Sequence, residues 1–252
     1  MQGTAGQRVL ANDLPRPGRT LFASTRRCRW IAGLATLVMS LSLASLPCQA
    51  SEMAFAVTQL GSDAGGICGR GCVEVISAKG EIDGDTADRF LGFLSNHLQE
   101  QDLRPVILLD SPGGTVVGAM KLGTVFRKIG AEVVVGESMR VPGTDRMGLA
   151  SGQCMSACVY AFFGGKQRVV PTSSRLGIHR MVINEGSRDP AGGFAAQQTF
   201  GSEEFVATLS AYTRSMGVDP NVIVQAERIA PEAIRILTPR EIARWRLARS
   251  RF

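Results

Sequence analysis

Histidine is scarce in this sequence, which restricts any imidazole chemistry to two positions. The 252 residues include two histidines, His97 and His179. His97 falls in the polar turn of a segment with helical periodicity, so we expect a solvated surface side chain. His179 follows the short apolar segment 176–178, which predicts a side chain at the rim of a sheet. A lone histidine there is as often structural as catalytic, so its role depends on its neighbours.

No run of basic residues occurs outside the first 50 positions, which argues against a nucleic-acid partner. The chain carries 28 Lys and Arg against 22 Asp and Glu, a formal charge of +6. Residues 1–50 hold six of the arginines and one aspartate, which leaves 22 basic and 21 acidic residues in the rest. No stretch there can follow a phosphate backbone. With 44% hydrophobic and 20% charged residues, the composition is that of a globular protein with one core.

The excess positive charge belongs to an N-terminal leader. Arg26, Arg27 and Arg29 precede an uncharged apolar segment at 30–47, and the small residue Ala50 follows shortly after it. This order predicts a secretory signal peptide cleaved after Ala50, with an uncleaved membrane anchor through residues 30–47 as the alternative. Both interpretations put the remaining chain outside the cytoplasm, periplasmic or secreted, or held at the inner membrane.

The chain after the leader contains four cysteines in two C-x3-C pairs, Cys68 with Cys72 and Cys154 with Cys158. An even number in an exported protein predicts disulfides, whose pairing the sequence leaves open. A bridge between Cys154 and Cys158 on one helical face would need a strained reach. We interpret it as a structural staple, with redox control as the alternative. A zinc site is a weaker interpretation of these cysteines than disulfides, because their spacing departs from C-x2-C. We expect no metal and no cofactor.

Strand and helix patterns alternate after residue 72. Strands are expected at 73–77, 105–110, 132–136, 168–170 and 176–178, and helices at 83–100, 116–129, 155–163, 203–216, 220–229 and 239–248. Continuous apolar strands joined by helices indicate parallel pairing and the α/β class, followed by a helical tail. We expect a loose lead-in at 51–72 and a single domain at 73–252. Loops are expected at 137–152 and 182–200, the first polar and the second mobile.

A glycine pair follows the expected strand at 105–110. The motif Ser111-Pro-Gly-Gly114 lies between that strand and the next helix. Two glycines let a backbone approach a ligand closely and turn its N–H groups outward, where they can hold an oxyanion or a phosphate. The alternative is a tight turn without a ligand.

A second motif, Gly152-Gln-Cys-Met-Ser156-Ala157, begins the helix expected at 155–163. It predicts Ser156 at a helix N-terminus, with the N–H of Ala157 free to donate. Serine is a common N-cap, so this motif alone does not indicate catalysis. Together with His179 and the glycine turn, however, Ser156 completes the set of nucleophile, base and oxyanion donors that acyl transfer requires.

Three motifs in register resemble a known protease family. Ser111-Pro-Gly-Gly114, Gly152-Gln-x-x-Ser156 and Pro171-x-Ser-x-Arg-x-x-Ile-His179 occur in the order and approximate spacing of the proteolytic subunit of the Clp protease. The chain is also similar to small exported ClpP-like proteins, whose serine helix tends to carry flanking cysteines. The resemblance covers about residues 73–180 well and the helical tail loosely.

The resemblance implies a ClpP/crotonase-type fold, a superhelix of β-β-α units, and a serine hydrolase that acts on peptides or proteins. It gives Ser156 the role of nucleophile and His179 that of general base. It also assigns the oxyanion hole to the backbone N–H groups of Gly114 and Ala157.

The sequence departs from the family at the third member of the triad, an aspartate in the tail. Our alignment puts Ala230 at that position, so Asp219, Glu227 and Glu232 are the candidates for orienting His179 instead. Loss of the orienting carboxylate in a triad costs about 10⁴ in turnover. A slow Ser–His dyad and an inactive site are both compatible with this departure.

The resulting expectation is an exported ClpP-like serine peptidase. The main alternative is a weakly active or inactive member of the same fold that binds peptides or acts as a scaffold. Two further alternatives are acyl-coenzyme-A chemistry on the crotonase fold and a hydrolase with Lys121 or Lys166 as its base. The family's stacked rings cannot be assumed, because the segments at 137–152 and after His179 differ, so a homo-oligomer is an open possibility.

Overall fold

The computed structural model describes residues 51–61, 73–97, 105–144, 146–188 and 194–248. The leader at 1–50, the apolar segment at 30–47 and the cysteines Cys68 and Cys72 lie outside these ranges. Within them, no helix combines the length and apolarity needed to cross a membrane.

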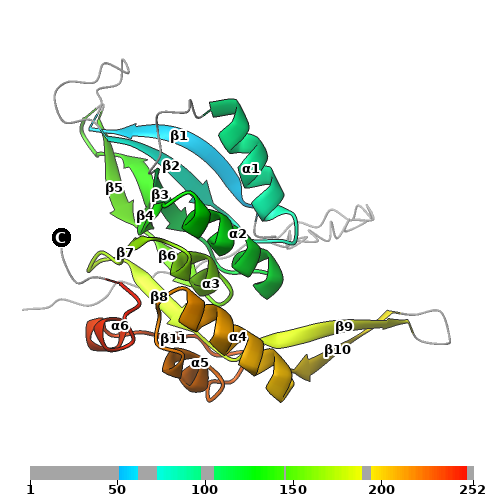
Figure 1. Cartoon of the computed structure of the whole chain (residues 1–252). Coiled ribbons are helices and arrows are strands. Elements are labelled where there is room, and N and C mark those ends of the chain that lie inside the picture. Colours follow the sequence, from blue (N-terminus) through cyan, green and yellow to red (C-terminus); the bar gives the residue numbers. More distant parts are fainter. Residues whose placement is uncertain (1–50, 62–72, 98–104, 145, 189–193, 249–252) are drawn as a thin grey trace, which may run out of the picture. The chain divides into compact units, whose positions relative to one another are not determined.

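The main sheet has six strands, and its centre is parallel (Figure 1). Strand β3 pairs in parallel with β2 and β4, and β4 also pairs in parallel with β7. Strands β1 and β5 are antiparallel to β2 and β4. The bounds are β1 (Ala54–Leu60), β2 (Val73–Lys79), β3 (Val106–Asp110), β4 (Glu132–Arg140), β5 (Met147–Ser151) and β7 (Gln167–Val169).

Three helices pack against this sheet through the main core. They are α1 (Thr86–His97), α2 (Val116–Lys128) and α3 (Cys158–Phe163). Alternate residues of the parallel strands, such as Ile107 and Val133, are fully buried beside Phe90 and Phe126. The order β2–α1–β3–α2–β4 confirms the α/β class with a mostly parallel sheet, because crossover helices connect parallel neighbours.

A second sheet of three strands joins the carboxyl end of β3 to the tail. Its strands are β6 (Gln153–Met155), β8 (Arg175–Ile178) and β11 (Arg235–Ile236). Strands β6 and β8 are parallel, and β11 is antiparallel to β8. A bridge between Ser111 and Cys154 connects β6 with the end of β3. Strands β6 and β8 therefore end in the same direction, close to the turn that contains Gly113 and Gly114.

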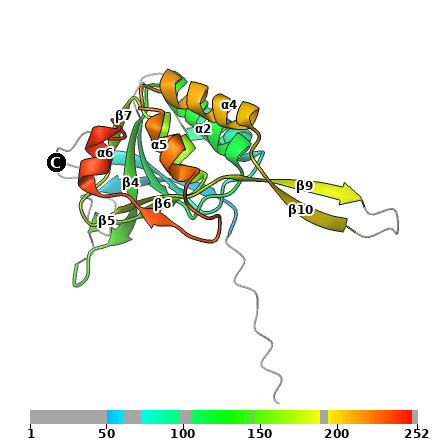
Figure 2. The same ribbon diagram turned by 90° about the horizontal axis from the view of Figure 1, so that it is seen from below.

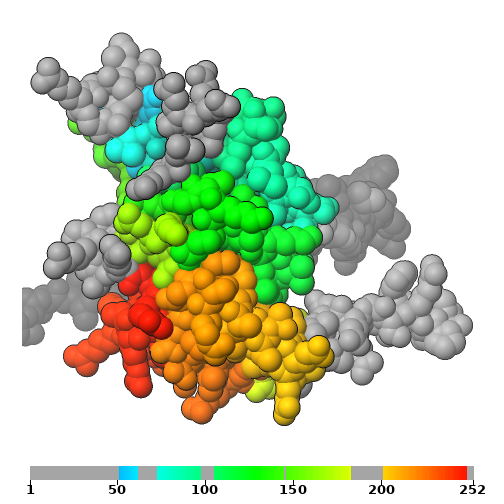
Figure 3. Space-filling view, viewed as in Figure 1, coloured from blue at the N-terminus to red at the C-terminus, as the bar shows by residue number. Residues whose placement is uncertain are grey.

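The helical tail packs into the main core and also makes polar contacts with α2 and α3. It comprises α4 (Glu203–Ser215), α5 (Asn221–Ala226) and α6 (Pro239–Arg244). The Tyr212 hydroxyl donates to the Tyr160 carbonyl at 2.8 Å, and the Arg127 guanidinium donates to the Met216 carbonyl at 2.7 Å. In the space-filling view the orange surface of α4 adjoins the green surface of α2 (Figure 3). Thr238 caps α6 in a capping box with Glu241.

Three segments expected to be loops contain strands instead. The lead-in contains β1, the segment 137–152 forms the hairpin of β4 and β5, and the segment 182–200 forms β9 (Val182–Arg188) and β10 (Phe194–Phe200). The β9–β10 hairpin extends away from α4 in both ribbon views (Figures 1 and 2). Local composition gave little signal there, because strand formation at an edge depends on the partner strand more than on intrinsic propensity.

Close packing of α2 against the end of α3 requires glycine at position 164. A Cβ added to Gly164 would lie 1.9 Å from the Gly123 carbonyl oxygen, which is backbone and cannot move aside. By contrast, a Cβ on Gly92, on the exposed face of α1, would meet nothing within 4 Å.

These two glycines give opposite predictions. Gly164→Ala should lower the free energy of unfolding by about 2 kcal/mol or more through overpacking. Gly92→Ala should raise it by about 0.5–1 kcal/mol, because alanine loses less backbone entropy in a helix. Urea unfolding of the two variants checks this, and equal midpoints would contradict the packing described for α2 and α3.

Candidate functional site

Ser156 lies in a sharp turn between β6 and α3. Its φ of 57° is in the left-handed region, which non-glycine residues rarely occupy. The Ser156 N–H donates to the Gly177 carbonyl at 3.0 Å, and the Ser156 carbonyl accepts from the Val159 N–H at 3.2 Å. The helix expected from residue 155 therefore begins later, at Cys158, and the chain reverses at the serine.

His179 is brought to this serine by the parallel pairing of β6 and β8. The register pairs Met155 with Gly177, so the residues just after each strand meet at one edge. The Nε2 atom of His179 lies 2.6 Å from the Ser156 Oγ, at hydrogen-bond distance. The structure thus unites the two residues that the sequence singled out, which lie 23 positions apart.

The environment of His179 favours the neutral imidazole. Burial lowers the pKa of His179 below its ordinary value, while the backbone of Arg180 and the charge of Glu232 act in the opposite direction. A neutral ring has a lone pair available for a proton from the hydroxyl. His97, in contrast, is exposed at the end of α1 and stacks on Phe93, as expected for a surface residue.

The glycine turn lies directly against Ser156. Gly113 and Gly114 have φ values of 119° and 133°. A Cβ on Gly113 would lie 2.8 Å from the Ser156 Cβ, and one on Gly114 would lie 1.9 Å from the Ile82 carbonyl oxygen. Only glycine fits at these two positions, because both the left-handed backbone and the space exclude a side chain.

Two backbone donors beside the serine are available. The β-bridge between Ile82 and Gly114 is made by two hydrogen bonds, one from the Ile82 N–H to the Gly113 carbonyl and one from the Thr115 N–H to the Ile82 carbonyl. It leaves the N–H of Gly114 unused. Among the described residues, neither that N–H nor the N–H of Ala157, at the N-terminus of α3, donates a hydrogen bond. They are the two donors that the resemblance assigned to an oxyanion hole.

None of the three expected carboxylates orients His179. Its Nδ1 atom is buried and has no hydrogen-bond partner in the described part of the chain. The Glu227 carboxylate pairs with Arg180 at 3.4 Å, and the Asp219 carboxylate accepts from the Asn221 N–H at 2.9 Å. Glu232 is exposed and acts on the histidine through its charge alone. The carboxylates expected as orienters are thus engaged elsewhere or exposed to solvent.

An isoleucine lies beside the end of β8, on the face that carries His179. Strand β11 pairs Arg235 with Ile178, and continuing this register by one residue places Ile234 opposite His179. A Cβ on Gly177 would lie 2.7 Å from the Ile234 Cγ2, so Ile234 lies on the strand face that Gly177 shares with His179. Ala230, the residue aligned with the family aspartate, is exposed and precedes β11. The sequence alone could not reveal this, because it did not predict β11.

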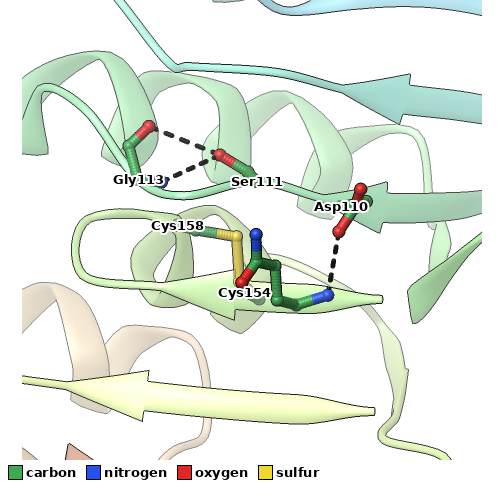
Figure 4. The surroundings of a disulfide bond; sticks show 6 residues. Asp110, Ser111, Gly113, Cys154 and Cys158 are labelled. Atoms are coloured by element: carbon green, nitrogen blue, oxygen red, sulfur yellow. Dashed lines mark hydrogen bonds between the residues drawn. A yellow bond between two sulfur atoms is a disulfide. The ribbon is translucent and has the colours of Figure 1, made fainter. Parts of the chain in front are cut away.

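The structure pairs Cys154 with Cys158 in a disulfide beneath the glycine turn (Figure 4). Their Cα atoms are 5.3 Å apart, which is within the usual range for a disulfide. The expectation of a strained reach was therefore wrong. The reason is that the two cysteines do not share a helix: Cys154 belongs to β6 and Cys158 begins α3. Across the described ranges, no three His, Cys, Asp or Glu side chains gather to hold a metal ion.

Comparisons with known proteins find similar solved structures at low sequence identity. A mutant of a membrane-bound stomatin-specific protease is 19% identical, covers 68% of this chain and 75% of its own, and has a TM-score of 0.46. A membrane protease from Pyrococcus horikoshii, specific for a stomatin homolog, is 18% identical over 69% of each chain, with a TM-score of 0.43. A ClpP1 mutant from Listeria monocytogenes is 14% identical over 67% of this chain and 84% of its own, with a TM-score of 0.43. No protein-family model and no curated protein matches the sequence.

Proposed function

We propose that this protein is an exported ClpP-like serine hydrolase that cleaves peptide bonds by acyl transfer. The observation that carries the proposal is the 2.6 Å contact between the Ser156 Oγ and the His179 Nε2, next to two unused backbone donors. Export is supported by the order of charge, apolar run and small residues in the leader. The peptide substrate is supported by the three motifs that resemble the Clp proteolytic subunit.

The chemistry follows from the positions of these groups. The Ser156 Oγ attacks the substrate carbonyl carbon while its proton passes to the His179 Nε2. The N–H groups of Gly114 and Ala157 hold the negative charge that develops on the carbonyl oxygen. The protonated histidine then gives its proton to the leaving amine, and the acyl group stays on Ser156. Water, activated by the same histidine, hydrolyses this ester and restores the serine.

A non-catalytic peptide-binding or scaffold protein is the second candidate. The observation in its favour is the buried Nδ1 of His179, to which no carboxylate among the described residues is hydrogen-bonded, so none holds the ring in the required tautomer. The two candidates differ in one property, the reactivity of Ser156 toward an acylating or phosphonylating reagent.

The first prediction separates these candidates with a fluorophosphonate probe. The protein should be labelled, and Ser156→Ala and His179→Ala should both abolish the labelling, because they remove the nucleophile and its base. His97→Ala is the matched control and should label like the parent. Labelling that survives in His179→Ala would contradict the role of base, and a parent protein that never labels would favour the scaffold.

The pH dependence of labelling gives a second prediction. Protonated imidazole cannot accept the serine proton, so the rate should be full above the pKa of His179 and fall as the pH drops through it. Because burial lowers this pKa, the half-maximal rate should occur at a lower pH than for an ordinary imidazole. The measurement is the labelling rate between pH 4 and 8 on a folded sample (about the range in which histidine titrates). A midpoint above the ordinary value would contradict the description of the site.

A third prediction adds the missing carboxylate. Ile234→Asp places an acceptor opposite His179, which should raise the pKa of the imidazole and fix its tautomer. The labelling rate should increase by about tenfold or more, within the roughly 10⁴-fold that a positioned aspartate contributes to a complete triad. Ile236→Asp is the control, because Ile234 and Ile236 are both 44% exposed but Ile236 faces Gly177. Equal rates in the two variants would contradict the placement of Ile234.

A further inference from the structure

The disulfide encloses the nucleophile between its two cysteines. Cys154 and Cys158 lie two residues before and two residues after Ser156, and both are fully buried. A fully extended chain would separate their Cα atoms by about 13 Å, whereas the observed separation is 5.3 Å. The bridge therefore holds the chain reversed at the serine.

Each cysteine is fixed to a different rigid part of the site. Cys154 lies in β6, which pairs with β8 on one side and contacts Ser111 at the end of β3 on the other. The Ser111 hydroxyl in turn accepts from the Gly113 N–H at 3.1 Å, within the glycine turn. Cys158 begins α3, all six residues of which are buried. The bridge thus ties β6, which contacts the start of the glycine turn at Ser111, to α3, which begins directly after the Ala157 donor.

The turn needs such a restraint because its backbone is unfavourable. A non-glycine residue in the left-handed region persists only where the surroundings hold it there, and Ser156 has a φ of 57°. This conformation also gives the Oγ its position against the His179 Nε2. Two backbone hydrogen bonds hold Ser156 itself, and the disulfide is the covalent restraint across it.

We propose that the Cys154–Cys158 disulfide is a positioning element for Ser156: it keeps the serine in its left-handed conformation and its hydroxyl on the histidine. The proposal rests on the proposed function for its effect on catalysis, although the contact it maintains exists independently of turnover. Because the bridge closes a ring of only five residues, its contribution to overall stability is small compared with that of a long-range bridge. Its loss should therefore act on the site more than on the fold.

The test compares oxidised and reduced forms of one chain. In a full-length background with Cys28, Cys48, Cys68 and Cys72 replaced by Ser, the bridge is the only one possible. Dithiothreitol reduces it in a balanced exchange: the protein S–S bond breaks to two thiols while the reagent's two thiols form its own disulfide. Mass analysis under denaturing conditions confirms the redox state of each sample.

Three readouts are taken from each form, namely the fluorophosphonate labelling rate, the urea midpoint and the nitrogen NMR titration of His179. Reduction should slow labelling by about 5- to 150-fold, the factor that corresponds to the cost of a left-handed non-glycine residue. The His179 titration should move to higher pH, because the neutral ring loses the hydrogen bond from the serine. Reoxidation should restore both values, and unfolding should remain cooperative.

Each result supports or overturns the proposal. Unchanged labelling and an unchanged His179 titration after reduction would overturn it. Slower labelling that accompanies loss of cooperative unfolding would show a purely structural staple and would also overturn it. If the oxidised protein never labels, the proposed function fails, and the His179 titration alone then decides whether the bridge positions Ser156. The double variant Cys154→Ala, Cys158→Ala should reproduce the reduced form without any reductant.

Discussion

The contact between Ser156 and His179 depends on the parallel pairing of two short strands, β6 and β8. Each strand contributes its next residue to the site, and the pairing of Met155 with Gly177 fixes how far apart these residues lie. The bridge between Ser111 and Cys154 then attaches this pair of strands to the end of β3, where the glycine turn begins. Nucleophile, base and oxyanion donors therefore meet at the carboxyl ends of strands, which is where ligand sites form in α/β sheets.

The sequence predicted the elements whose signal is local. Continuous apolar runs predicted β3 and β4, and helical spacing predicted α1 and α2. Ser156 and His179 were also found from the sequence, because two of the motifs end at these residues and the chain has few histidines. Strands β1, β5, β9 and β10 were missed, since their formation depends on partners elsewhere in the chain.

The parts of the site that sequence could not predict involve register and backbone conformation. A one-residue change of register moves a side chain to the other face of a sheet, so only the pairing of β11 with β8 identifies Ile234 as the residue across from His179. Similarly, the helix expected from residue 155 hid the turn at Ser156, and with it the unstrained path for a bridge between Cys154 and Cys158.

The site combines a well-placed nucleophile with an unsupported base. Burial lowers the pKa of His179 and so favours the neutral imidazole, which suits proton acceptance, but no described carboxylate fixes its tautomer. In this arrangement the position of Ser156 matters more than usual, because no third group within the described residues corrects the orientation of the ring.

The contact between Ser156 and His179 is tested most directly by nitrogen NMR of the two histidine side chains in the parent protein and in Ser156→Ala. Removal of the hydroxyl should shift the His179 resonances and move their titration to higher pH, while the His97 resonances stay unchanged. Identical His179 titrations in the two proteins would contradict the contact between the serine and the histidine, and with it the proposed chemistry.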